Sequence, residues 1–172
     1  KKFCRFGRAD ELKPSHCLKL RGFYYTEEEA SAKTFTIPSV VQKERYSRRE
    51  VMVPEKVIRL EDWLEFLGFW LADGYWRDGK NTQGNPRYTV GIKQREENEE
   101  YVMDLFHRIG FDAKVHRNKT GNHNYEVYSK QLWTALQPYG KAKDKYIPDC
   151  FLELEKTYSE RLLHGYEMGD GQ

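Results

Sequence analysis

The chain has 172 residues, a formal net charge of only +2 from 29 basic and 27 acidic residues, and 15% aromatic residues, 12 of them tyrosine. This length predicts one domain, or one domain with a small appendage, whose core buries roughly two thirds of the extended surface. The sequence has no apolar run long enough to cross a membrane, which takes about 18 residues, and the nearly balanced charge means that any basic surface must be local.

Three cysteines, Cys4, Cys17 and Cys150, form no Cys-x-x-Cys pair. Their odd number fits a reducing compartment better than a disulfide framework. Cys4 and Cys17, with His16, lack the fourth ligand and the paired spacing of a zinc site. The sequence therefore predicts neither disulfides nor zinc as the source of stability.

Residues 1–56 are interpreted as a basic, largely irregular extension that precedes the main domain. Lysines and arginines alternate with phenylalanines over residues 1–20, which is typical of a basic arm but equally of a solvated tail or a segment cut from a larger chain. Short extended pieces are expected at Phe23–Tyr25, from Ile37 onward, and at Val51–Pro54. Residues 57–172 carry the clearer patterns.

An apolar stretch from Trp63 to Tyr75 predicts a buried helix that ends at Asp73. Gly74 then stands where a left-handed, helix-ending residue is least costly. A weaker copy closes the chain, running from Arg161 to Gln172 and ending in Asp170-Gly171. The two copies predict two similar helices, each ending in an aspartate.

Small residues lie four apart in both copies, Gly68 and Ala72 in the first and Gly165 and Gly169 in the second. Residues four apart share one helix face, so these positions allow two helix backbones to approach closely. The simplest partner of one such helix is the other copy. We therefore expect the two helices to pack together with their aspartates at the same end.

Such a pair would bring together the carboxylates of Asp73 and Asp170, each at a helix C-terminus, where the helix dipole disfavours negative charge. Two neighbouring carboxylates also repel each other. Oxygen ligands in this setting suit Mg²⁺, and a metal between acidic groups favours hydrolysis of a phosphodiester. The alternative is that both Asp-Gly pairs are simple helix-ending turns, since this dipeptide is common in turns.

Between the two copies the pattern predicts an α+β unit. Strands are expected at 75–80 and 87–94, a helix at 96–109 closed by Gly110, strands at 111–117 and 124–128, and a helix at 130–136. A segment at 145–148 then leads into a helical region that begins at Phe151 and runs into the second copy. The expected order is helix, two strands, helix, two strands, helix.

Three blocks of the sequence resemble the LAGLIDADG homing endonucleases. Phe66–Gly74 and Leu163–Gly171 resemble the two signatures of the two-motif branch, which is often embedded in inteins, and Lys145–Leu154 resembles the Lys-x-Ile-Pro block that precedes the second signature. The resemblance covers about Val57 to Gln172. It implies an αββαββα half-saddle with an antiparallel sheet, followed by the start of the second motif helix.

The resemblance also implies a catalytic centre. Its catalytic residues would be Asp73, Asp170, Lys145 and Gln94, and its metal site would comprise Asp73, Asp170, Ala72 and Gly169, holding Mg²⁺ with Mn²⁺ as a substitute. Lys145 would stabilise charge on the phosphate or orient the attacking water, and Gln94 would position water. Alternatively, Lys145 belongs to a solvated cluster of lysines at 141–145.

In the resembled family the sheet lies in the major groove of double-stranded DNA, so its outer side chains should suit base edges and phosphates. The alternative for these residues is a polar hairpin in water. The DNA-binding candidates are Lys80, Asn81, Gln83, Arg87, Thr89, Lys93, Arg95, Lys114, His116, Arg117, Asn118, Lys119, Asn122, His123 and Asn124.

The resulting hypothesis is a Mg²⁺-dependent, site-specific DNA endonuclease domain of the kind found in inteins, located in the cytoplasm or another DNA-containing compartment. The chain stops two residues after Asp170, so we expect a second half-domain in the same or a partner polypeptide. No splicing signature is present, which favours an endonuclease insertion over a splicing domain. The alternatives are a non-cleaving nucleic-acid binder, such as an RNA maturase or transcription regulator, and an interaction module.

Overall fold

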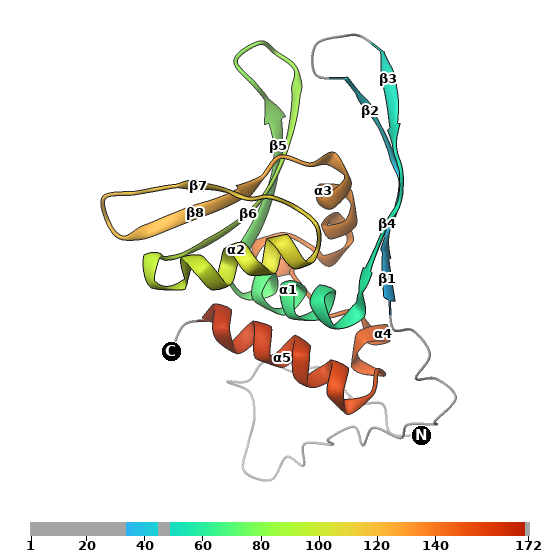
Figure 1. Cartoon of the computed structure of the whole chain (residues 1–172), viewed down its shortest axis with the longest axis vertical. Helices are drawn as coiled ribbons and strands as arrows, with labels where there is room; N and C mark the ends of the chain where they lie inside the picture. The colour runs from blue at the N-terminus through green and yellow to red at the C-terminus, as the bar shows by residue number, and fades with distance from the viewer. Residues whose placement is uncertain (1–33, 45–48, 171–172) are drawn as a thin grey trace.

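The structure is a computed structural model that describes residues 34–44 and 49–170. Its centre is helix α1 (Leu60–Asp73), which is buried along most of its length. Figure 1 shows α1 between a second long helix, α5 (Lys156–Asp170), and the main sheet. The predicted basic arm, the patch at Phe23–Tyr25 and Gly171 lie outside the described residues.

The main sheet is antiparallel and has the spatial order β5-β6-β8-β7. Helix α2 follows the first strand pair, after a short 3-10 turn, and helix α3 follows the second. The bounds are β5 (Gly74–Lys80), β6 (Pro86–Arg95), α2 (Glu99–Arg108), β7 (Lys114–His116), β8 (Asn122–Val127) and α3 (Lys130–Leu136). The predicted α+β class and the order αββαββα from α1 to α3 are confirmed.

Alternation along the strands decides which face of the sheet meets the helices. Val90 and Ile92 of β6 and Tyr125 of β8 are fully buried beneath α1 and α2, and the residues between them point to the opposite face. We call that opposite face the outer face of the sheet. Helix α2 ends before Gly110, whose φ of +77° suits glycine, and Ser129 caps α3 by accepting a hydrogen bond from the Leu132 amide at 3.1 Å.

A second β element precedes α1. The extended pieces expected from Ile37 onward and at Val51–Pro54 overlap its strands, but the strands pair with one another, which corrects the expectation of a largely irregular extension for the described residues. Strand β1 (Thr34–Ile37) pairs with β4 (Lys56–Arg59), and β2 (Val40–Lys43) pairs with β3 (Glu50–Val53), both antiparallel. Together they form a long two-stranded ribbon that runs beside the β5–β6 hairpin (Figure 1). The domain boundary predicted after residue 56 falls inside β4.

Two of the contacts that fix the ribbon to the main domain lie at different points along its length. The Phe35 ring stacks on Trp63 of α1 with centroids 4.2 Å apart. Further along, the buried side chain of Gln131 in α3 donates hydrogen bonds to the backbone carbonyls of Pro38 at 3.1 Å and Pro54 at 2.7 Å. These contacts join the ribbon to the same core as the sheet, because Trp63 is one of its largest buried side chains.

The segment between α3 and α5 also differs from the prediction. A short helix, α4 (Asp149–Leu152), is followed by Glu153, and α5 starts only at Lys156, so the single helical region expected from Phe151 is two helices. Two 3-10 turns, Gln137–Tyr139 and Ala142–Asp144, precede them. None of the helices in the described ranges is long and apolar enough to span a membrane.

Candidate functional site

Helices α1 and α5 approach each other through their glycines. A Cβ atom on Gly68 would lie 2.0 Å from the carbonyl oxygen of Leu162, and a Cβ on Gly165 would lie 2.0 Å from that of Glu65. Nearer the helix ends, a Cβ on Gly169 would lie 2.7 Å from the Cβ of Ala72. The close packing predicted from the small residues four apart is confirmed.

This packing places Asp73 and Asp170 at the same end of the helix pair, as predicted. Both carboxylates are exposed and line one cavity of about 480 Å³, together with Lys93 and Arg95 from the outer face of the sheet. Partial burial raises the pKa of Asp73 above its ordinary value, and the neighbouring charge of Asp170 raises it further. Ionised Asp73 is therefore an unfavourable charge in the metal-free chain.

The backbone at Gly74 differs from the prediction of a left-handed helix end. Its φ of −81° and ψ of 163° are extended, because α1 passes directly into strand β5. The glycine is needed for space: a Cβ there would lie 2.2 Å from Cδ1 of the Trp70 indole. The Asp-Gly pair is thus a helix-to-strand junction packed against Trp70.

Gln94 connects the ends of the two helices. From the buried end of β6, its Nε2 donates to Oδ2 of Asp73 at 3.1 Å and to the carbonyl oxygen of Gly169 at 3.2 Å. Its Oε1 accepts from the Arg95 amide at 2.9 Å, which fixes the orientation of the side-chain amide. Gln94 therefore holds the Asp73 carboxylate in place through its side-chain amide donor.

Lys145 reaches the end of α1, but its ammonium contacts the backbone. Nζ donates to the carbonyl oxygens of Trp70 at 2.7 Å, Leu71 at 3.2 Å and Gly74 at 2.5 Å. Burial lowers the pKa of Lys145 to about 8, while the charge of Asp73 acts in the opposite direction. At neutral pH the side chain is therefore still largely cationic, and it caps the negative end of the helix that carries Asp73.

Replacing Lys145 with methionine is expected to lower the free energy of unfolding by about 1–3 kcal/mol, because the carbonyl oxygens at the end of α1 lose the hydrogen bonds that the ammonium donates. Urea unfolding of the metal-free chain measures this effect. Lys143→Met is the matched control, since Lys143 is exposed in the same segment. Equal unfolding midpoints for the two variants would show that Lys145 does not cap α1.

The donor set at the helix ends fits a divalent cation of the hard, oxygen-binding kind. Among residues 34–44 and 49–170, no group of three His, Cys, Asp or Glu residues is placed to hold a metal ion. Asp73 and Asp170 would therefore act with backbone oxygens, such as those proposed at Ala72 and Gly169, and with water or phosphate. Mg²⁺ is commonly bound by one or two carboxylates plus water and phosphate, whereas Zn²⁺ sites use His or Cys.

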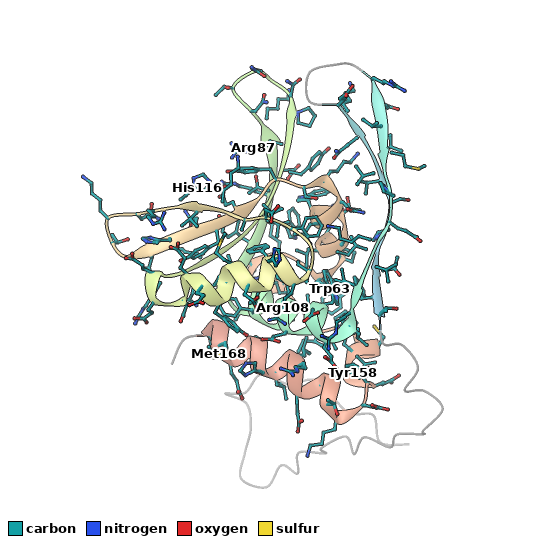
Figure 2. All side chains as sticks on the ribbon, in the orientation of Figure 1. Trp63, Arg87, Arg108, His116, Tyr158 and Met168 are labelled. Atoms are coloured by element: carbon teal, nitrogen blue, oxygen red, sulfur yellow. The ribbon has the colours of Figure 1, made fainter. Side chains whose placement is uncertain are left out.

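Most of the predicted DNA-binding residues lie on the outer face or at the hairpin tips beside it. Figure 2 shows two of them, Arg87 and His116, on the side of the sheet away from α1 and α5. The strand register places on this face the side chains of Arg87, Lys93, Arg95, Lys114, His116, Asn122 and Asn124. The hairpin loops and strand ends carry Lys80, Asn81, Gln83, Arg117, Asn118 and Lys119.

Two predicted contacts are wrong. His123 is 3% exposed and faces the core, where its Nδ1 accepts from the Asn118 amide at 3.3 Å. Thr89 belongs to the outer face by alternation, but it is only 1% exposed and so offers nothing to a partner. The alternation of side chains along β8 explains why His123 is buried. His123 lies two residues before the buried Tyr125 and hence on the same side of the strand.

The prediction missed four residues of the outer face: Tyr75 and Arg77 of β5, Glu126 of β8, and Tyr128, which follows it. Tyr75, Arg77 and Tyr128 all contact the Glu126 carboxylate. Side chains alternate between the two faces of a strand, so counting along β5 from the end of α1 would have placed Tyr75 and Arg77 on one face. Their meeting with Glu126 depends on the pairing of β6 with β8, which no local pattern reveals.

No protein-family model matches the chain. It is 25% identical over 114 residues to the DNA-directed RNA polymerase subunit beta C-terminal section of Stigeoclonium helveticum, and 26% identical over 116 residues to a DNA polymerase of Thermococcus sp. (strain GE8). The alignments cover 60% and 64% of this chain but only 10% and 6% of these relatives.

Among solved structures, the chain is similar to I-DmoI in complex with DNA and Mn, at 14% identity and a TM-score of 0.49, over 64% of this chain and 62% of that one. It is also similar to the LAGLIDADG meganuclease I-AabMI bound to uncleaved DNA, at 15% identity and a TM-score of 0.36, over 47% and 30% of the two chains. Both identities are below 25%, so these similarities concern the fold alone.

Proposed function

We propose that this chain is the DNA-recognising and metal-binding half of a LAGLIDADG-type homing endonuclease, which hydrolyses phosphodiester bonds of double-stranded DNA with Mg²⁺, or Mn²⁺ in its place. One observation carries the proposal: the paired aspartates at the helix ends share a cavity with Lys93 and Arg95 of the outer face. An acidic pair that suits a metal thus adjoins a basic surface that suits phosphate.

Asp73 and Asp170 would hold the cation, which when bound stabilises charge on a phosphoryl oxygen and lowers the pKa of a bound water. The chain's own side chains have separate roles. Gln94 orients Asp73, Lys145 stabilises the end of the helix that carries it, and Lys93 and Arg95 would bind phosphates beside the acids. Side chains further out on the sheet would contact base edges in the major groove.

Cutting both strands would require a second half-sheet on the other side of α5, in the same or a partner polypeptide. Helix α5 supports this, because it exposes Leu163 and Tyr166, at 54% and 42%. These two apolar side chains lie one turn apart and are therefore neighbours on the helix surface. A second sheet that packs there would bury them as the first sheet buries the apolar face of α1.

We further propose that the endonuclease is carried by an intein. The alignments cover 60% and 64% of this chain but only a small part of an RNA polymerase subunit and of a DNA polymerase. A chain that resembles a minor part of two different polymerases is expected of an inserted element.

The proposal is tested by incubating the chain with a randomised duplex DNA library, in Mg²⁺ or EDTA, and scoring both retention and cutting. We expect a subset of sequences to be retained. With about four phosphates neutralised, affinity should fall by roughly a hundredfold between about 50 and 200 mM salt. Lys93→Gln should weaken retention, whereas Lys156→Gln, which removes the same charge from the start of α5, should not.

The outcomes separate the candidate functions. Cuts that require Mg²⁺ would support the endonuclease. Specific retention without cuts would favour a non-cleaving nucleic-acid binder that uses the same outer face. Absence of retention at low salt, or equal effects of the Lys93 and Lys156 variants, would overturn the assignment of the sheet as a DNA-binding surface.

A further inference from the structure

The outer face of the sheet contains a buried acid at its middle. Glu126 of β8 is 3% exposed, although its strand neighbours on this face are polar or basic and reach solvent. Burying a carboxylate is costly unless it is paired and hydrogen-bonded. Negative charge also opposes the binding of a polyanion. An acid in this position therefore needs a function that compensates for the cost of burial and for weaker binding of a polyanion.

Both oxygens of the Glu126 carboxylate are occupied. Oε1 accepts from the Tyr75 hydroxyl at 2.7 Å and from Nη2 of Arg77 at 2.6 Å. Oε2 accepts from the Tyr128 hydroxyl at 2.8 Å and lies 3.5 Å from Nε2 of His116 and 3.9 Å from Nη2 of Arg87. Strands β5, β6 and β7 and the end of β8 thus all place a polar side chain around one carboxylate.

Gly91 makes this arrangement possible. It stands on β6 between Tyr75 and Glu126, paired with both across the sheet. A Cβ at Gly91 would lie 2.4 Å from Cζ of the Tyr75 ring. Because glycine leaves this space open, the tyrosine crosses a whole strand and reaches the acid two strands away.

The acid stays ionised and its arginines stay accessible. Burial by itself would raise the pKa of Glu126, but the hydrogen bonds from Tyr75 and Tyr128 and the charge of Arg77 lower it overall. The side chains of Arg77 and Arg87 are 58% and 43% exposed. The guanidinium of Arg87 also lies over the Tyr128 ring, 4.1 Å from its centroid. Each arginine is thus held at one point while its remaining donors face outward.

We infer that Glu126 is a positioning residue for sequence recognition: it fixes Arg77 directly, and Arg87 through Tyr128, as readers of base edges. The inference rests on the proposed function, because it assumes that duplex DNA lies on this face. A fixed guanidinium discriminates between base pairs, since its forked donors match guanine in only one geometry. An arginine without a fixed orientation can bind any nearby phosphate, whatever the base sequence. The buried acid therefore lowers non-specific affinity and raises discrimination.

The test compares Glu126→Gln with the wild-type chain in binding to the duplex library. Discrimination should fall about tenfold or more at the base pairs read by the two arginines. Binding to random duplex should become tighter and more salt-dependent, because a negative charge has been removed from the middle of the basic outer face. Glu100→Gln is the matched control: it removes the same charge from an exposed position on α2, outside this network, and should keep wild-type discrimination.

Arg77→Lys provides a second variant in case Glu126→Gln does not fold. Lysine keeps the positive charge but lacks the forked donors of the guanidinium. The variant should therefore lose discrimination at the same base pairs, while its affinity for random duplex stays within about twofold of wild type. Wild-type discrimination in either folded variant would overturn the inference and leave the proposed function intact. Failure of the wild-type chain to retain any duplex would instead overturn the proposed function, and this inference with it.

Discussion

Replacing Gly165 with alanine is expected to lower the free energy of unfolding by about 3 kcal/mol, even though alanine in a helix is normally favoured over glycine by about 1 kcal/mol. The added Cβ would lie 2.0 Å from the carbonyl oxygen of Glu65 and 3.0 Å from the amide nitrogen of Phe69. These are backbone atoms of a buried helix, so α1 and α5 must move apart. Urea unfolding measures the change.

Gly79→Ala is the control for this prediction. Gly79 lies in the exposed part of β5, where an added Cβ would meet nothing within 4 Å. Its unfolding midpoint should therefore remain close to that of the wild type. A Gly165→Ala chain as stable as the wild type would show that the two helices do not approach through their glycines.

Asp73→Asn is expected to reduce DNA cleavage by at least about a thousandfold in the enzyme with both halves present, since a lost metal ligand removes several kcal/mol of transition-state stabilisation. The same change should abolish the rise in melting temperature that Mg²⁺ or Mn²⁺ gives to this chain. Asp78→Asn, an exposed acid on β5, is the control and should keep both properties. Undiminished cutting by the Asp73 variant would remove Asp73 from the catalytic site.

The metal-free chain should respond in the opposite direction, because Asp73→Asn removes a charge that the fold disfavours. The pKa of Asp73 is raised in the folded state by partial burial and by Asp170. The wild-type chain therefore gains stability from this group as the pH falls from neutral through the raised pKa, and keeps the gain below the ordinary value of 3.8. The asparagine variant should show this gain at neutral pH and lose the corresponding pH dependence.

The helix pair was predictable from the sequence because its signal is local. Glycine or alanine at i and i+4, with an aspartate one residue after the second, fixes both the contact and the end at which the acids meet. The strand-to-strand contacts of Glu126 were not predictable in this way. They depend on Gly91 lying opposite both Tyr75 and Glu126. Helix α2 separates β6 from β8 in the sequence, so no local pattern predicts how these two strands pair.

The pairing of the ribbon strands and the inward position of His123 were not predicted, for different reasons. Strands β1 to β4 are only four residues long, and their stability comes from tertiary contacts such as the stacking of Phe35 on Trp63. Segments of this length are too short for a hydrophobic pattern to predict how they pair. His123, in contrast, shares its strand phase with Tyr125 and Val127, so a strand extended by two residues would have placed it inside.

The glycine contacts between α1 and α5 also bear on how such a protein can change its target. The distance between the two acids is set by main-chain atoms, because Gly68 and Gly165 meet backbone carbonyls and not side chains. Substitutions on the outer face therefore leave that distance unaltered. On the proposed function, exchanging arginines, lysines and asparagines on the sheet would change the target sequence while the spacing of Asp73 and Asp170 stays the same. Backbone contacts that fix this spacing would let specificity evolve without loss of the chemistry.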